Sequence, residues 1–246
     1  MEPVLTLDPM TEPDVEAETQ DARARVLDAA SRLLAGGGRQ ALTTRAVASA
    51  ASVQAPTLYR LFGEKQGLLD AVAEHVLASF VADKAVHPPH PDPVEDLRAG
   101  WDSYVAFGLA NPAVFAIINE IGEPTSGSPA TLAGVAVLRE RVERVARAGR
   151  LGVSVDRAVA LIHAAGLGTV ATLIATKEKA RDLHLSPSTR DAVLSAILTP
   201  SSTPGKDSGR ASLAIALRAR LREISDLTPG EHLLLTELLD RLSKSH

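Results

Sequence analysis

The stretch Leu42-Thr-Thr-Arg-Ala-Val-Ala-Ser-Ala-Ala-Ser-Val-Gln-Ala-Pro-Thr-Leu-Tyr-Arg-Leu-Phe62 decides the fold of this chain. Its apolar residues recur at helical spacing in two short runs, and a tight turn at residues 51–53 separates them. Thr43 stands where the first run begins and is a favourable N-cap. We therefore predict two short helices with a small shared core, formed by Val47, Ala48, Val53, Leu58 and Phe62.

The outer side of the second short helix carries the residues that this core leaves free: Gln54, Ala55, Pro56, Thr57, Tyr59 and Arg60. Two helices arranged in this way form a helix-turn-helix, which buries one face so that the other can enter the major groove of DNA. The hydroxyl groups and the cation on that side are spaced to meet phosphates on both sides of such a groove. The motif predicts binding to double-stranded DNA.

Helical patterns also flank the motif. Upstream, apolar residues recur at helical spacing from Val26 until three glycines, Gly36-Gly-Gly38, end the pattern. Downstream, a longer helix is expected from about Lys65, and the proline-rich run at 87–93 cannot be helical inside. The second short helix, which carries the DNA-facing side chains, is therefore expected to lie among three other helices.

Composition divides the chain further. Residues 1–20 hold six acidic residues and no lysine or arginine. We expect, in order, an acidic disordered arm at 1–20, a DNA-binding domain at 21–81 with its motif at 43–62, a proline-rich linker at 82–92, and a larger helical domain at 93–246 with a flexible loop at 199–210.

Prolines act as start signals in the larger domain. A good N-cap residue precedes each of Pro93, Pro112, Pro129, Pro187 and Pro229. The expected helices are 93–110, 112–121, 129–148, 154–177, 187–198, 212–225 and 229–243. Helix 154–177 is apolar on nearly all sides, which predicts a central position. The fold class is therefore all-α, with an N-terminal three-helix helix-turn-helix domain and a C-terminal helical bundle.

The overall composition restricts the function classes. Of the 246 residues 45% are apolar, enough for a buried core, and none is cysteine, which excludes disulfide frameworks and thiolate metal sites. No run approaches the roughly 18 uninterrupted apolar residues of a membrane span. The net charge of −4 does not argue against DNA, because basic residues outnumber acidic ones by four to one between Arg39 and Lys65. We expect a cytoplasmic protein without a membrane partner.

The run from Leu42 to Val72 resembles the DNA-binding domain of the TetR (tetracycline-repressor) family. An ordered set of residues carries the resemblance: Ala48, Ala51, Val53, Thr57-Leu58-Tyr59, Phe62, Lys65 and Leu68-Leu69. Two departures are visible. Ser52 stands where the family commonly has glycine, and Ala55 and Leu61 stand where polar side chains often occur.

The resemblance implies a role for each DNA-facing residue. Phosphate contacts would come from Thr43, Thr57, Tyr59 and Lys65. Arg45 and Gln54 are the candidate base readers, because arginine can address guanine and glutamine adenine with two hydrogen bonds. The expected DNA-binding set is completed by Thr44, Ala55, Pro56 and Arg60. For any one residue alone the alternative is a structural helical hairpin, and the ordered set favours DNA.

Further along, the segments from Tyr104 to Phe115 and from Ile162 to Gly168 resemble one subgroup of TetR-family C-terminal domains. Such domains bind small molecules and dimerise. Aromatic residues with a few polar anchors would suit an apolar pocket, and the expected ligand-binding set is Trp101, Tyr104, Phe107, Phe115, Asn119 and His163, with Glu120 nearby. Core filling is the alternative for each aromatic residue.

No enzyme signature, cofactor fingerprint or metal site emerges. Gly166-Leu-Gly168 lies inside an expected helix, so it indicates close helix packing and not dinucleotide binding. His87 and His90 have no third metal ligand nearby. We expect no catalytic residue, no cofactor and no metal.

The chain is expected to form a homodimer. Two helix-turn-helix motifs related by a two-fold axis would match a pseudo-palindromic operator, whereas one motif buries too little surface. The expected interface uses helix 154–177 or 187–198 together with 212–225 or 229–243. The leading hypothesis is a repressor that a small apolar molecule releases from its operator. The alternatives are an all-helical lipid or small-molecule carrier without DNA binding, and an α-helical enzyme with an unrecognised site.

Overall fold

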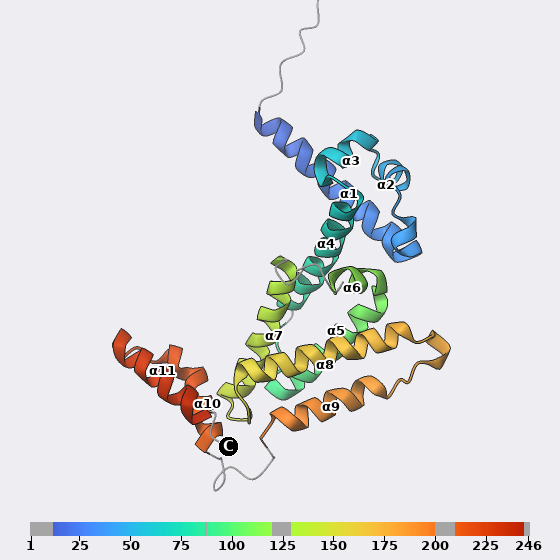
Figure 1. The fold of residues 1–246 in the computed structure, drawn as a ribbon. Coiled ribbons are helices and arrows are strands. Elements are labelled where there is room, and N and C mark those ends of the chain that lie inside the picture. Colours follow the sequence, from blue (N-terminus) through green and yellow to red (C-terminus); the bar gives the residue numbers. More distant parts are fainter. Residues whose placement is uncertain (1–11, 87, 120–128, 200–209, 244–246) are drawn as a thin grey trace, which may run out of the picture. The chain divides into compact units, whose positions relative to one another are not determined.

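The computed structural model describes residues 12–86, 88–119, 129–199 and 210–243, and this part of the chain confirms the all-α class (Figure 1). It holds eleven α-helices, and its strand-like pairing is an isolated antiparallel bridge between Leu151 and Leu198. The chain forms two compact units. One comprises residues 1–79 and 113–125, and the other comprises residues 80–112 and 126–246.

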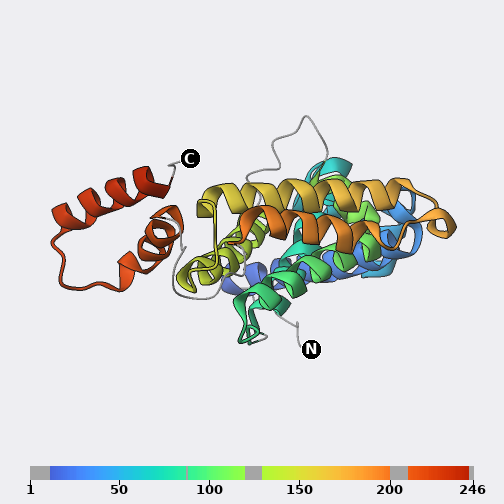
Figure 2. The same cartoon turned by 90° about the horizontal axis from the view of Figure 1, so that it is seen from below.

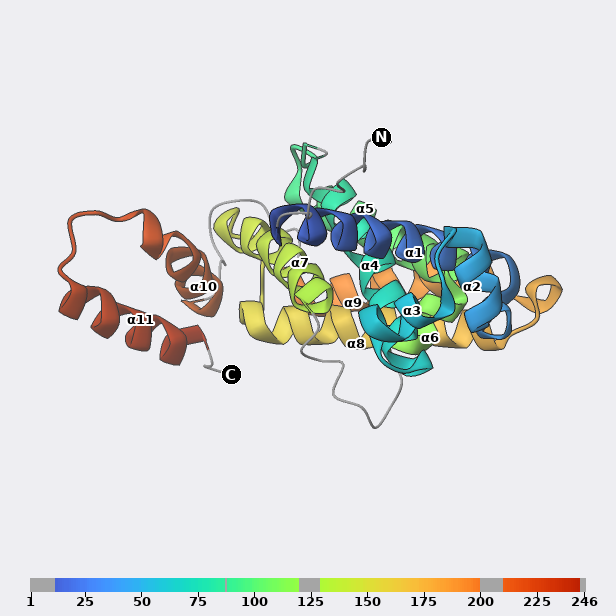
Figure 3. The ribbon, with the colours of Figure 1, turned by 90° about the horizontal axis from the view of Figure 1, so that it is seen from above.

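The first unit contains α1 (Glu12–Ala41), α2 (Thr44–Ala51), α3 (Ala55–Phe62), the larger part of α4 (Lys65–Val86) and most of α6 (Pro112–Ile118). In Figure 3, α2 lies beside α1 and α3 follows α2. Gly38 has φ 63° and ψ −165°, so α1 breaks there, as the glycine run predicted. The buried side of α1 is formed by Val26, Ala29, Ala30 and Leu34.

Two boundaries differ from the expectation. Because α1 begins at Glu12, residues 12–20 are helical and the predicted disordered arm was wrong for them, while residues 1–11 lie outside the described residues. Because α4 continues to Val86, residues 82–86 are helical and are not a linker. In both places the polar composition suggested a break, but a solvated helix tolerates the same residues.

The second unit contains α5 (Pro93–Ala110), α7 (Pro129–Arg147), α8 (Val155–Ala175), α9 (Leu185–Ile197), α10 (Arg210–Arg220) and α11 (Pro229–Ser243). The helices predicted at Pro93, Pro112, Pro129 and Pro229 begin at those residues, whereas α9 begins two residues before Pro187. The helix expected at 112–121 ends at Ile118, and the one expected at 212–225 ends at Arg220, before a 3-10 turn at Leu221–Glu223. Local start signals were thus more informative than end signals.

The central helix of the second unit is α8, which packs against α5, α7 and α9. At Gly166 an added Cβ would lie 3.3 Å from Tyr104 Cε1 and 3.7 Å from Trp101 Cζ3, so the glycine lets α5 approach closely. This confirms the close packing predicted for Gly166. In contrast, Gly168 meets nothing within 4 Å, because it lies on the side of α8 that no described residue covers.

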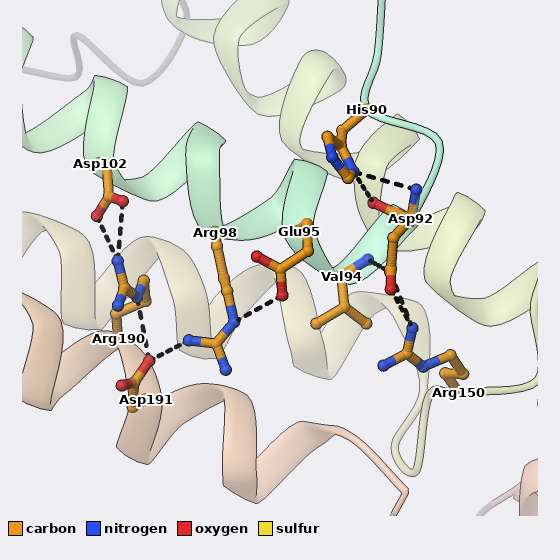
Figure 4. A network of polar contacts seen from close by, with 9 residues as sticks. All are labelled: His90, Asp92, Val94, Glu95, Arg98, Asp102, Arg150, Arg190 and Asp191. Atoms are coloured by element: carbon orange, nitrogen blue, oxygen red, sulfur yellow. Dashed lines mark hydrogen bonds and ion pairs between the residues drawn. The ribbon is translucent and has the colours of Figure 1, made fainter. Parts of the chain in front are cut away.

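A network of ion pairs joins α5 to α9 (Figure 4). Arg190 Nη1 lies 2.7 Å from Asp102 Oδ1, and Arg190 Nε donates to Asp191 at 3.1 Å. Arg98 pairs with both Asp191 and Glu95. The guanidinium groups of Arg190 and Arg98 hold the pKa of Asp191 below its usual value. The network fixes α9 along α5 through residues that lie far apart in the sequence.

A second set of polar contacts holds the start of α5. The buried Asp96 carboxylate accepts from Arg144 Nη1 at 2.8 Å and from the His90 N–H at 2.9 Å. Asp92 caps α5 by accepting from the Val94 N–H at 2.8 Å, and it also pairs with Arg150. Those contacts, the Val94 bond foremost, lower the pKa of Asp92. His90 therefore has a structural role in this loop.

Candidate nucleic-acid interface

The helix-turn-helix forms as predicted from residues 43 to 62. Thr43 Oγ1 accepts from the Ala46 N–H at 3.2 Å and caps α2. The residues buried between α2 and α3 include those that the sequence assigned to a shared core: Val47, Ala48, Leu58 and Phe62. Val53, the fifth predicted member, is half-buried at the turn. One side of each short helix is therefore used for packing and the other is free.

The turn between α2 and α3 places a serine in the left-handed region. Ser52 has φ 54° and ψ 44°, and among the described residues it alone combines a side chain with positive φ. The Val53 N–H donates to the Ala48 carbonyl at 3.0 Å, which satisfies the end of α2. A side chain in this conformation costs about 1 kcal/mol more than glycine. The turn keeps its shape although the sequence departs from glycine.

All ten predicted DNA-binding residues are accessible to solvent. Seven are exposed, namely Thr43, Arg45, Gln54, Pro56, Tyr59, Arg60 and Lys65, and three are half-buried, namely Thr44, Ala55 and Thr57. Tyr59 is an aromatic side chain with 59% of its surface exposed, although Leu58 beside it is buried. The unit thus presents a large amphipathic side chain to solvent where a phosphate partner was predicted.

The charges at the N-termini of α2, α3 and α4 favour binding of an anion. None of α2, α3 and α4 carries an acidic residue in its first turn, whereas α5, α8 and α11 do. The free N–H groups at a helix start attract negative charge, and an acidic side chain there would compete with a phosphate. Lys65 adds a cation at the first position of α4. Gln54 makes no side-chain capping bond, so its amide is available to a base.

Two residues outside the predicted set hold the C-terminal end of α3. Arg23 Nη1 donates to the Leu61 carbonyl at 3.1 Å, and its guanidinium carbon lies 4.6 Å from the centre of the Phe62 ring. At Gly67 an added Cβ would collide with the Phe62 carbonyl oxygen. No sequence pattern indicates Arg23, because its partner lies 38 residues away. A glycine in the first turn of α4 was the available signal for Gly67.

The predicted ligand-binding residues are only partly brought together. Trp101 is 6% exposed, and its Nε1 donates to Ser186 Oγ at 3.1 Å. Tyr104 lies beside it at Gly166, and burial raises the pKa of the Tyr104 phenol to about 12. Phe107 stacks on Phe80 with ring centres 4.4 Å apart. The Trp101 geometry agrees with core filling, which the sequence left open.

The remaining members of that set lie elsewhere. His163 is exposed on α8. Phe115 and Asn119 belong to the first unit, where Asn119 Nδ2 donates to the Phe115 carbonyl at 2.8 Å, and Glu120 lies outside the described residues. Helical spacing suggested proximity for these residues, but it does not fix which helices meet.

Comparison with known proteins gives a family for the first unit. Residues 26–72 match the model described as bacterial regulatory proteins, tetR family. The match begins three residues after Arg23 and includes α2, α3 and the first turns of α4. None of the curated proteins matches this chain. No match supports a carrier.

Several solved structures share the fold of this chain. A protein of unknown function from Rhodococcus sp. RHA1 shares 21% identity over 72% of this chain and 96% of its own, with a TM-score of 0.60. The fatty acid degradation regulator FadR from Bacillus halodurans shares 20% over 70% and 94%, with a TM-score of 0.55. A TetR family transcription regulator from Marinobacter aquaeolei VT8 shares 20% over 75% and 100%, with a TM-score of 0.52. The all-helical fold is common to them.

We predict that Arg23→Ala weakens binding to a duplex selected from a random pool by about tenfold, because α3 loses a charged hydrogen bond and a ring contact at its end. The salt dependence of duplex binding should not change, since Arg23 contacts groups of the protein and not a phosphate. Fluorescence anisotropy over a salt series measures both.

Arg25→Ala is the matched control, because it removes the same charge from α1, while the partner of Arg25 among the described residues is Asp21 in its own helix. Arg23→Lys should recover part of the affinity. A salt slope reduced by about one in Arg23→Ala would contradict the positioning role and make Arg23 a phosphate contact.

Proposed function

Residues 26–72 are the DNA-binding domain of a tetR-family regulatory protein, and from this premise we propose that the chain is a homodimeric repressor acting in the cytoplasm. A small apolar molecule releases it from a pseudo-palindromic operator. The observation that carries the proposal is α3, an eight-residue helix that is packed on one side and exposed along Pro56, Tyr59 and Arg60 on the other. This geometry suits reading of a major groove, and no enzymatic step is needed.

In this function the flanking residues position the protein on the duplex. The Thr43 hydroxyl accepts from the Ala46 N–H, which leaves its own proton free to donate to a phosphate. Tyr59 and Lys65 donate to phosphates from the far side of the motif. Arg45 and Gln54 read base edges, so they carry the specificity.

The second unit supplies the dimer contact through α8 and α9, which lie side by side (Figure 2). An 18-residue window of α8 has a mean hydropathy of 1.9, high enough for a membrane span, yet only 39% of it is buried. Its exposed side includes the small residues Ala160, Ala164, Gly168 and Ala171, beside Leu161 and His163. Small side chains let two helices approach closely, so the same side of a second copy covers this surface best.

The effector acts near the contact between α5 and α8, where Trp101 and Tyr104 meet Gly166. Phe107, which belongs to the same unit and stacks on Phe80, supplies further apolar surface. The helix α4 runs from the phosphate contact Lys65 to Val86 in the second unit. A shift of that helix would change the separation of two recognition helices that must lie about 34–36 Å apart.

For the DNA contacts we predict that Tyr59→Phe and Lys65→Ala weaken binding to selected and random duplexes alike, because both groups donate to phosphate. Lys65→Ala should also lower the salt slope by about one contact. Arg45→Ala should instead reduce the preference for the selected duplex, by about 1–3 kcal/mol per lost base contact. Unchanged affinity in all three folded variants, measured by anisotropy, would refute the assignment.

For the dimer we predict that Ala164→Glu gives a monomer at micromolar concentration, because a charge would be buried without a partner in the α8 contact. Sedimentation velocity measures the change. The control is Ala106→Glu, the same substitution at an exposed alanine of α5. A dimer that survives Ala164→Glu would place the interface elsewhere.

For regulation we predict that an inducer binds free protein about 5–150-fold more tightly than operator-bound protein, since coupling between sites is about 1–3 kcal/mol and reciprocal. Trp101 is the single tryptophan, so its fluorescence reports binding at the α5–α8 contact. Trp101→Phe should impair release from DNA and leave ligand-free binding intact. Equal affinities for the two forms would exclude that ligand as an inducer.

A further inference from the structure

The carboxylate of Asp96 in α5 faces two arginines of α7. One of its oxygens accepts from the His90 N–H at 2.9 Å and the other from Arg144 Nη1 at 2.8 Å, so both already have a short bond. Arg141 Nε lies 3.5 Å from the second oxygen, which is a long ion pair. Because Arg141 and Arg144 share a single negative charge, this cluster of three side chains keeps one positive charge in excess.

The guanidinium group of Arg141 makes no hydrogen bond to any residue that the structure describes, and its side chain is 21% exposed. Since every fully buried side-chain nitrogen in the described part of the chain has a hydrogen-bond partner, solvent must reach the nitrogens of Arg141. A guanidinium carries five N–H donors in a planar fork, two of which can bond a carboxylate side by side. Arg141 therefore offers donors for an anion.

Gly100 of α5 fixes where this guanidinium lies. A Cβ atom added at Gly100 would collide with Arg141 Nη1 and would lie 3.1 Å from Arg141 Cζ. The guanidinium group thus lies against the backbone of α5, in room that exists because residue 100 has no side chain. A donor group held by its surroundings loses less conformational freedom on binding, so this placement favours recognition of an anion.

Beside Arg141, the middle of α7 is apolar and incompletely covered. All buried residues of α7 lie outside the stretch 131–141. Within that stretch the apolar side chains of Val135, Val137 and Leu138 are half-buried. Apolar side chains that stay partly in contact with water favour an apolar ligand that covers them.

Half-buried aromatic residues lie at the far end of this stretch. Phe107 of α5 stacks on Phe80 of α4. It follows Gly100 by seven residues on the same side of the helix, which is two turns or about 10 Å. On α7 the same spacing separates the arginine from Gly134, whose added Cβ would lie 3.7 Å from Val81 Cγ2 of α4. An apolar surface from three helices therefore begins about 10 Å from the guanidinium group.

We propose that Arg141 binds the carboxylate of a monocarboxylic acid whose apolar chain lies against Phe80 and Phe107, and that this acid is the effector. The effector role rests on the proposed function, whereas the binding site does not. The excess of one positive charge suits a monoanion. A phosphate monoester carries nearly two negative charges at neutral pH and would bring the second close to Asp96, while an alcohol would leave the excess charge unpaired.

Isothermal titration calorimetry with three eight-carbon probes tests the chemical class. Octanoate should bind the full chain at least about tenfold more tightly than octan-1-ol and octyl phosphate, because hydrogen bonds between charged groups are the stronger ones. Equal binding of the alcohol, tighter binding of the phosphate, or no binding of octanoate would overturn the proposal.

Two substitutions separate recognition from packing. Arg141→Gln should weaken octanoate binding by at least about tenfold and leave octan-1-ol binding unchanged. Gly100→Ala should do the same with the arginine still present, since the added methyl group displaces the flexible end of the arginine side chain and not the helix backbone. Arg139→Gln is the matched control on α7, where Arg139 pairs with the exposed Asp156, and should bind octanoate as before. If Arg141 only supports the fold, Arg141→Gln will lower the melting temperature and keep the preference for octanoate, which would refute the site.

Release from the duplex distinguishes this site from the proposed function. Octanoate should release the selected duplex from the wild-type chain and not from Arg141→Gln. Binding of octanoate through Arg141 without release would leave the site standing and overturn its effector role. A ligand-free chain that binds no duplex would instead refute the repressor and leave the Arg141 site intact.

Discussion

An eight-residue helix in water does not keep its conformation by itself, and everything the first unit does depends on holding one such helix still. Leu58 and Phe62 anchor α3 on its inner side. Arg23 and Gly67 hold its last turn, one by bonding a carbonyl and the other by leaving room for one. The exposed residues of α3 have a defined position only because α1, α2 and α4 surround its other sides.

In the second unit the central helix α8 is so apolar that part of its apolar surface stays exposed. Its inner side is well packed, and Gly166 allows α5 to come within contact distance through Trp101 and Tyr104. Its outer side exposes small residues such as Ala160 and Ala164 beside Leu161 and His163, and leucines are also exposed on α10 and α11. Both surfaces cost free energy when hydrated, which supports the proposed association with a second copy.

The polar contacts show how distant segments are kept in register. Arg98 and Asp191 lie 93 residues apart in sequence, and Arg144 reaches Asp96 across 48. Each pair joins α5 to another helix, and the Asp96 pair is largely removed from water. Such pairs contribute more to the choice of arrangement than to stability, because desolvation offsets much of their attraction. Burial of Tyr104, which raises the pKa of its phenol, belongs to the same closely packed region.

The sequence by itself determined the helix starts at Pro93, Pro112, Pro129 and Pro229, together with the helix-turn-helix and its exposed residues, because caps, prolines and helical spacing act over four residues or fewer. It even indicated the turn at Ser52 and the close packing at Gly166. Only the tertiary structure decided that Arg23 supports α3, that His163 points to solvent away from the buried side of α8, and that α8, α10 and α11 each leave an apolar side uncovered. Those outcomes depend on which helices meet, and partners dozens of residues apart leave no local pattern in a sequence.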